Sequence, residues 1–197
     1  MKPEKRAWLT KWKNPSDIER QFSPNNWGYT LSHPDKAYMA SCPTLLDYGK
    51  LYGSEYPSDW IHIQVLALYG SSNNKDVGVA DGIKLFAQSF AQEVKTYKIS
   101  ELMLFFARYK AGKYDNSYAS FDAKRIGNAF FSEFIKERNR ELDRITREQT
   151  QEEIEQFAQL SPAQKVKWIQ SNSADSGVFG YLEASLYNPN ARREKVG

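Results

Sequence analysis

Hydrophobic residues recur at intervals of three and four over most of the chain that follows residue 41. This spacing places them on one face of an α-helix, which is the pattern of a helix packed against a core. One such stripe runs from Asp81 to about Lys95, and another begins at Ser100 and stops at Gly112. The stripes consist of Ile83, Phe86, Phe90 and Val94, and of Leu102, Phe105, Phe106 and Tyr109. The pattern predicts a helix in both places.

Further helices are predicted on both sides of these two stripes. One covers residues 43–52 and the next covers residues 58–69, each followed by a glycine. A long helix is predicted over about residues 121–150, where Glu and Arg interleave at helical spacing in the second half, so that this part projects into solvent or over another subunit. We therefore predict an all-α protein with about seven helices in one globular domain over residues 34–197.

The first 33 residues have a different pattern and are predicted to form an N-terminal arm and linker. A short helix is expected over Glu4–Lys13, and Asn14–Pro15 then breaks it. The stretch over residues 23–41 contains two prolines, a glycine and few periodic hydrophobic residues. These features are typical of an extended loop, with a short strand expected at residues 28–31.

The arm carries two tryptophans, Trp8 and Trp12, whose spacing of four places both indoles on one helical face. Two exposed indoles would form an apolar patch near the largest that a monomer tolerates. We expect them to be covered, either by the chain's own core beside Trp168 or by a partner subunit. In the second case Trp8 and Trp12 are the partner-binding residues.

Composition and charge narrow the class of protein without fixing it. The net charge of +3 and the pI near 8.8 permit a phosphate backbone as partner but do not require one. The single cysteine, Cys42, cannot form an internal disulfide, and we expect a buried thiol there. No stretch approaches the roughly 18 apolar residues of a membrane span, and no signal peptide is recognisable, so we expect a cytoplasmic protein with no membrane partner.

Sequence signatures of catalysis are missing. The phosphate-binding loop, the nucleophile elbow and the zinc protease motif are all absent. His33 and His62 are far apart and have no clustered cysteine, which argues against a zinc site. Asp35 could join Glu93 and Lys95 around magnesium, but helical geometry points Glu93 and Lys95 to different faces. We expect no enzyme activity, no cofactor and no metal.

Basic and aromatic residues are concentrated at residues 110–125, between two predicted helices, and we call this stretch the basic–aromatic corner. Cations spaced for a phosphate backbone, together with rings on which bases stack, are the elements of a nucleic-acid site. The predicted contact residues are Lys110, Lys113, Tyr114, Tyr118, Lys124 and Arg125. The alternative is that the tyrosines fold back and pin the turn, with lysines there because loops are hydrated.

A longer segment around the corner resembles a known group of proteins. The segment is "ISELMLFFARYKAGKYDNSYASFDAKRIGNAFFSEFIKERNREL", over about residues 99–142. It is similar to small helical proteins of bacteriophages and mobile elements, especially from Bacteroides-type bacteria. Some of these resemble helicase loaders or replisome organisers. The resemblance places Lys110, Gly112 and Tyr114 in the turn, and Phe134 with Arg138 at the close of the second helix.

Two functional hypotheses follow. The leading one is a non-enzymatic accessory protein of phage or mobile-element DNA metabolism that binds DNA, a replicative helicase-like partner, or both. The alternative is a structural or assembly protein, such as a virion component or packaged cargo factor, joined to its neighbours through the aromatic arm.

Overall fold

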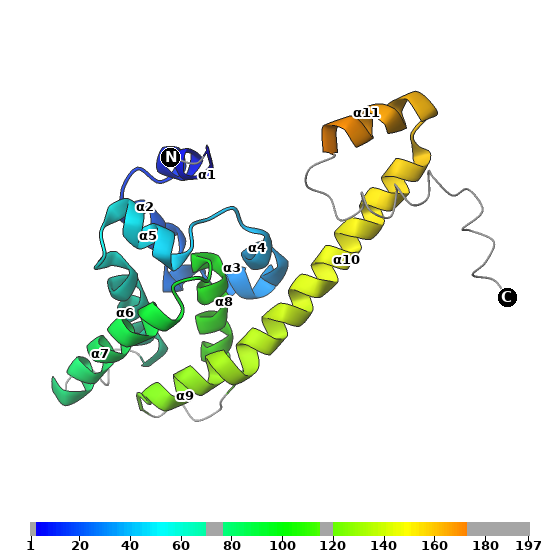
Figure 1. The fold of residues 1–197 in the computed structure, drawn as a ribbon. Helices are drawn as coiled ribbons and strands as arrows, with labels where there is room; N and C mark the ends of the chain where they lie inside the picture. Colours follow the sequence, from blue (N-terminus) through cyan, green and yellow to red (C-terminus); the bar gives the residue numbers. More distant parts are fainter. Residues whose placement is uncertain (1–2, 70–76, 115–119, 173–197) are drawn as a thin grey trace. The chain divides into compact units, whose positions relative to one another are not determined.

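The computed structural model describes residues 3–69, 77–114 and 120–172 of the 197-residue chain (Figure 1). Every regular element within these ranges is a helix, and the one extended pairing is an isolated bridge between Thr44 and Lys98. The predicted all-α class is confirmed. The chain divides into two compact units, residues 1–139 and 140–197. This division falls inside a helix, whereas the sequence had suggested a boundary near residue 33.

The N-terminal part of the first unit is a series of short helices. They are α1 (Pro3–Lys11), α2 (Pro15–Gln21), the 3₁₀ turn η1 (Pro24–Asn26), α3 (Trp27–Ser32) and α4 (Pro34–Met39). The extended loop expected over residues 23–41, and the strand within it, are wrong. The prolines there occupy the first helical position, where the missing N–H costs nothing, so they start helices instead of breaking them.

The longer helices follow. They are α5 (Leu45–Tyr52), α6 (Tyr56–Tyr69), α7 (Val77–Glu93), α8 (Ile99–Lys110), α9 (Ala123–Asn128), the π-helical segment η3 (Ala129–Phe134), α10 (Ile135–Gln159) and α11 (Pro162–Asn172). Since α9, η3 and α10 follow one another without a break, the long helix predicted to end near residue 150 continues to residue 159.

Helix α8 lies in the middle of the first unit, between α3 and α4 on one side and α6 on the other (Figure 1). Nearly all of its residues are buried, from Ile99 to Tyr109. Phe105 packs edge to face against Phe130 of η3, with ring centroids 5.0 Å apart. Phe130 in turn packs against Phe90 of α7 at 5.4 Å. This aromatic cluster is the core that the two hydrophobic stripes predicted.

Buried hydrogen bonds fasten the N-terminal helices to α6. The carbonyl of Phe22 accepts from Trp60 Nε1 at 3.1 Å and from Gln64 Nε2 at 2.9 Å. Gln64 Oε1 accepts in turn from Trp27 Nε1 at 2.9 Å. The buried Gln64 side chain thus forms hydrogen bonds through both its oxygen and its nitrogen, as buried polar groups usually do. The arm is therefore part of the first unit.

The two arm tryptophans have different surroundings. Trp12, just after α1, is 2% exposed, packs against Phe22 and donates its indole N–H to Gln21 Oε1 at 2.8 Å. Trp8 is half-buried. The expected cover for Trp12 is thus the chain's own first unit. Trp168 does not take part, because it packs against Phe157 in the second unit.

The second unit contains most of α10 together with α11. Phe157 is its buried centre, with Trp168 at 5.2 Å between ring centroids. The surface of α10 carries ion pairs at helical spacing, in which Arg144 meets Glu141 at 3.0 Å and Glu148 at 2.7 Å. Pairs of this kind stabilise an exposed helix by a few tenths of a kcal/mol each.

Candidate functional site

The basic–aromatic corner contains a glycine in the left-handed conformation, close to the end of α8. Gly112 has a φ of 80° and donates its N–H to the carbonyl of Tyr109 at 3.0 Å. The next N–H, that of Lys113, bonds to the carbonyl of Arg108 at 3.0 Å. Together these bonds form a Schellman motif, which satisfies the last carbonyls of α8 and turns the chain away. The prediction that Gly112 ends this helix is confirmed.

Three side chains at the end of α8 and in the turn after it contact one carboxylate, that of Glu137 in α10. Tyr114 donates its hydroxyl to Glu137 Oε2 at 2.7 Å, and Arg108 Nη1 lies 3.0 Å from the same oxygen. Lys113 Nζ pairs with the other oxygen, Oε1. A single carboxylate thus holds both the end of α8 and the turn that follows it.

These contacts shift the pKa values of Glu137 and Tyr114. Burial alone raises the pKa of Glu137, but the hydrogen bonds from Lys113 and Tyr114 and the positive charge of Arg108 outweigh it and hold that pKa below its ordinary value. Burial, together with the nearby carboxylate, raises the pKa of Tyr114. The corner therefore contains an ionised Glu137 and a neutral phenol at neutral pH.

Three of the predicted contact residues, Lys110, Lys113 and Tyr114, are bonded to other parts of the protein. Lys113 and Tyr114 meet at Glu137, where Tyr114 also stacks on Phe105 with ring centroids 5.9 Å apart. Lys110 donates to the carbonyl of Leu68 on α6. For Tyr114 this is the alternative arrangement, in which the tyrosine folds back and pins the turn, while Lys110 and Lys113 are bonded to protein groups.

The remaining members of the predicted set lie beyond the turn. Arg125 pairs with Asp122, the N-cap of α9, at 3.3 Å. Lys124 is exposed beside it. Tyr118 lies outside the described residues. That these three contact a nucleic acid stays a prediction.

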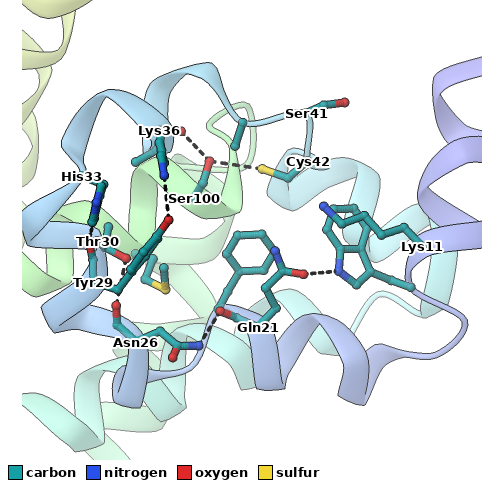
Figure 2. Close-up of a pocket in the computed structure, with 15 residues that line it drawn as sticks. Lys11, Gln21, Asn26, Tyr29, Thr30, His33, Lys36, Ser41, Cys42 and Ser100 are labelled. Carbon is teal, nitrogen blue, oxygen red and sulfur yellow. Dashed lines mark hydrogen bonds between the residues drawn. The ribbon is translucent and has the colours of Figure 1, made fainter.

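A second concentration of basic and aromatic side chains surrounds a pocket of about 440 Å³, formed by α2, α3, α4 and the start of α8 (Figure 2). We call it the Tyr29 pocket. Its apolar lining comes from Trp12, Phe22 and Met103, while Lys11, Lys36 and His33 supply basic side chains. All of the lining residues belong to the first unit.

Tyr29 stands at the mouth of this pocket and is 57% exposed. Its ring stacks on His33, with centroids 4.4 Å apart and planes inclined by 24°. Lys36 Nζ donates to the Tyr29 hydroxyl at 2.9 Å (Figure 2). The ring is thus supported on one face and at its tip, although most of its surface is open to solvent.

Cys42 and Ser100 lie side by side in the lining of the pocket (Figure 2). Ser100 donates its hydroxyl to the carbonyl of Ala37 at 2.7 Å, so the Cys42 thiol, 3.2 Å away, donates to Ser100 Oγ. Burial raises the pKa of Cys42. The thiol is therefore protonated at neutral pH, which is the state of a structural cysteine and not of a nucleophile. The expectation of a buried thiol is confirmed.

A more open cleft of about 650 Å³ adjoins the pocket, and we call it the Arg20 cleft. Its charged lining residues are Lys11, Lys13, Asp17 and Arg20. Asp17 pairs with Arg20 at 3.0 Å and accepts the backbone N–H of Lys13 at 3.0 Å. Because three basic residues stand against this one carboxylate, the cleft carries a net positive charge.

Two amide side chains lie where the pocket and the cleft meet, Gln21 and Asn26. Gln21 Oε1 accepts from Trp12, and Asn26 Nδ2 donates to the carbonyls of Arg20 at 3.2 Å and Gln21 at 2.8 Å. These bonds fix the direction of each amide. Gln21 Nε2 and Asn26 Oδ1 have no partner among the described residues, so one donor and one acceptor stay available.

Sequence reasoning missed this pocket because it interpreted residues 23–41, with their two prolines, as an extended loop. Tyr29, His33 and Lys36 are spaced by four and three, which is a helical pattern. In the structure the pattern is divided between two helices, since α3 ends at Ser32, His33 has non-helical backbone angles, and Pro34 is the first residue of α4. Reading this proline as a helix start would have placed Tyr29 and Lys36 on two consecutive helices joined at His33.

Within the described ranges, no group of three or more His, Cys, Asp or Glu side chains is arranged to hold a metal ion. A search of the same ranges finds no helix with the length and hydropathy needed to cross a membrane.

Comparison with known proteins gives one match. Residues 83–174 are similar to a family described as a family of unknown function (DUF6633). The match covers less than half of the chain. It contains the basic–aromatic corner and α8, but not the helices α1 to α4 that form most of the Tyr29 pocket. No curated protein and no solved structure matches the chain.

Proposed function

We propose that this chain is a non-enzymatic accessory protein of DNA metabolism that binds single-stranded nucleic acid at the Tyr29 pocket. The observation that carries the proposal is the exposed ring of Tyr29, held at the mouth of a concave site by His33 and Lys36. A supported aromatic face among cations is how proteins bind unpaired bases without reading their sequence.

The chemistry of the pocket favours a single strand over a duplex. An unpaired base can turn out of its stack and enter a concave site, where an aromatic side chain covers its face. Stacking of this kind is worth about 1–3 kcal/mol per base. The cations of the Arg20 cleft lie beside the pocket, where the phosphates of the same strand would release counterions on binding.

The corner is a weaker candidate for this role. Tyr114 is used for packing and Lys113 for an internal ion pair, so neither is free to contact a base or a phosphate. We retain Lys124 and Arg125 as a second contact region for DNA or for a helicase-like protein. The setting in a phage or mobile element, and in the cytoplasm of a bacterial host, rests on the resemblance of residues 99–142.

The assembly hypothesis loses its main support. Trp12 would have to leave the core of the first unit to anchor a neighbour, at the cost of its packing and its indole hydrogen bond. Trp8, half-buried on α1, is what remains of the proposed partner-binding pair.

Fluorescence anisotropy with labelled oligonucleotides tests the proposal. Single-stranded DNA should bind more tightly than duplex DNA of the same length, and binding should weaken as salt is raised. Tyr29→Ala should weaken binding about 5-fold or more, as expected for the loss of one stacked base. Tyr29→Phe is the matched control, since it removes the bond to Lys36 but keeps the ring, and it should bind almost as well as the wild type.

A second variant separates the pocket from the corner. Changing Lys124 and Arg125 to Gln removes two cations at the corner and leaves the pocket intact. If this variant loses binding while Tyr29→Ala does not, the corner is the site and the pocket proposal is wrong. Absence of binding at low salt would remove the nucleic-acid function altogether.

A further inference from the structure

We propose that the Tyr29 pocket and the Arg20 cleft together form a site for one nucleoside phosphate, with the base in the pocket and the phosphate in the cleft. The choice of ligand class rests on the proposed function, but the inference goes further. It assigns the base to the pocket and the phosphate to the cleft. It also predicts that a single mononucleotide binds even when it is not part of a strand.

The two concavities differ in the chemistry of their linings. The pocket is bounded by Trp12, Phe22 and Met103, and its volume of about 440 Å³ lies in the range of about 300–1,000 Å³ that is usual for small-molecule sites. Flat heteroaromatic groups suit such a lining, because they replace water on apolar surface. The cleft has charged side chains instead and suits a hydrated anion.

The charges of the cleft favour a phosphate over a neutral group. Arg20 is 82% exposed in its side chain, and its bond to Asp17 uses one of its five donors. Lys13 Nζ has no partner among the described residues, and Lys11 Nζ lies 4.5 Å from the ring centre of Trp12. Asp17 opposes an incoming anion, but its charge is offset by Arg20, so Lys11 and Lys13 leave the cleft with a net positive charge.

The amides at the junction would contact the part of the ligand between base and phosphate. Gln21 Nε2 offers a donor and Asn26 Oδ1 an acceptor, and both amides are fixed by the bonds of their other atoms. A pre-oriented donor and acceptor suit the edge of a base or a sugar hydroxyl. A fixed pair also costs little entropy on binding.

Calorimetric titration of the full chain tests this division with three probes: adenosine 5′-monophosphate, adenosine and inorganic phosphate. The nucleotide should bind more tightly than either fragment. Changing Lys13 and Arg20 together to Ala should weaken the nucleotide about 10-fold, because phosphate contacts are lost, while the affinity for adenosine stays unchanged. Tyr29→Ala should weaken both the nucleotide and adenosine.

A competition experiment tests whether the nucleotide and the single strand bind at the same site. Unlabelled nucleotide should displace a labelled single-stranded oligonucleotide from the wild-type chain. If the strand binds and the nucleotide does not, or if both bind without competing, the inference is wrong while the proposed function stands. If the nucleotide binds but the Lys13 and Arg20 changes have no effect on it, the assignment of the phosphate to the cleft is overturned. If neither ligand binds, both proposals fail.

Discussion

Tyr114 donates a hydrogen bond to Glu137 across 23 positions of sequence, at a distance of 2.7 Å. The bond ties the turn after α8 to the beginning of α10, and Arg108 and Lys113 converge on the same carboxylate. A turn that looked like an exposed basic surface is in this way fastened to the core of the first unit.

Replacing Glu137 with Gln should therefore destabilise the protein. The substitution keeps the shape of the side chain but leaves Arg108 and Lys113 without their counter-charge. Hydrogen bonds to charged groups contribute about 1.5–3 kcal/mol, and we expect the free energy of unfolding to fall by about 2 kcal/mol. Urea unfolding at pH 7 measures the change. The control is Glu133→Gln on the exposed side of η3, which should change stability by less than about 0.5 kcal/mol. Equal effects of the two variants would contradict the role of Glu137.

The same carboxylate predicts a loss of stability in acid. The pKa of Glu137 is below its ordinary 4.5 in the folded chain, so the unfolded chain binds that proton more readily.

A second carboxylate, Asp47, should act in the same way. Burial alone raises the pKa of Asp47, but Lys5, paired with it at 2.7 Å, and Thr44 hold it below 3.8. The contribution of each group is complete above its ordinary pKa and is lost as the pH falls through the lowered value.

The pH dependence separates Glu137 from the other carboxylates. Unfolding of the wild type and of Glu137→Gln is compared at pH 7 and at pH 3. The difference in free energy between them should shrink at pH 3, because the wild-type carboxyl is then becoming protonated and uncharged. A difference that stays constant over this range would mean that the charge of Glu137 contributes nothing.

Gly112 and Gly127 form a matched pair for testing the end of α8. Ala at Gly112 must adopt a φ of 80°, which L-residues avoid at a cost of about 1–2 kcal/mol. Ala at Gly127 in α9 meets no atom within 4 Å and should stabilise the helix by up to about 1 kcal/mol. Thermal melting should shift in opposite directions for the two variants. A shift of the same sign in both would show that the Schellman turn is not what Gly112 provides.

Trp12→Ala should lower stability without changing association. Removing a large aromatic side chain from a core costs about 3–5 kcal/mol. Trp8→Ala should cost less, because Trp8 is only half-buried. Thermal melting gives the stability, and light scattering gives the molecular mass of both variants. If Trp12→Ala changes the oligomeric state and leaves the melting temperature unaltered, the partner-subunit hypothesis for the arm is restored.

Local sequence patterns were sufficient to predict the central helices. The stripes over α7 and α8 depend on spacings of three and four, and Gly112 is a stop because only a residue without Cβ enters the left-handed region easily. These features involve residues within one or two turns of each other. Each can therefore be found without knowing the rest of the fold.

Features that depend on distant residues were not predictable in this way. Lys113 and Tyr114 suggested a binding surface, and only the fold brings Glu137 to them. Trp27 has no obvious partner in sequence, yet it bonds to Gln64 of α6, 37 positions away. The error over residues 23–41 has a local cause instead, since a proline is equally compatible with ending one helix and starting the next.

The order in which the chain is made gives the contacts of α8 a further consequence. Tyr38 and Ala37 bond to Lys98, Ser100 and Arg108, which follow them by 60 to 70 residues. At about 5–20 residues per second, the N-terminal helices leave the ribosome several seconds before α8 exists to receive them. During that interval Ala37 and Tyr38 lack the partners on Lys98, Ser100 and Arg108 that they have in the folded chain. Because Ser100 and Met103 of α8 belong to its lining, the Tyr29 pocket is complete only after translation has passed Met103.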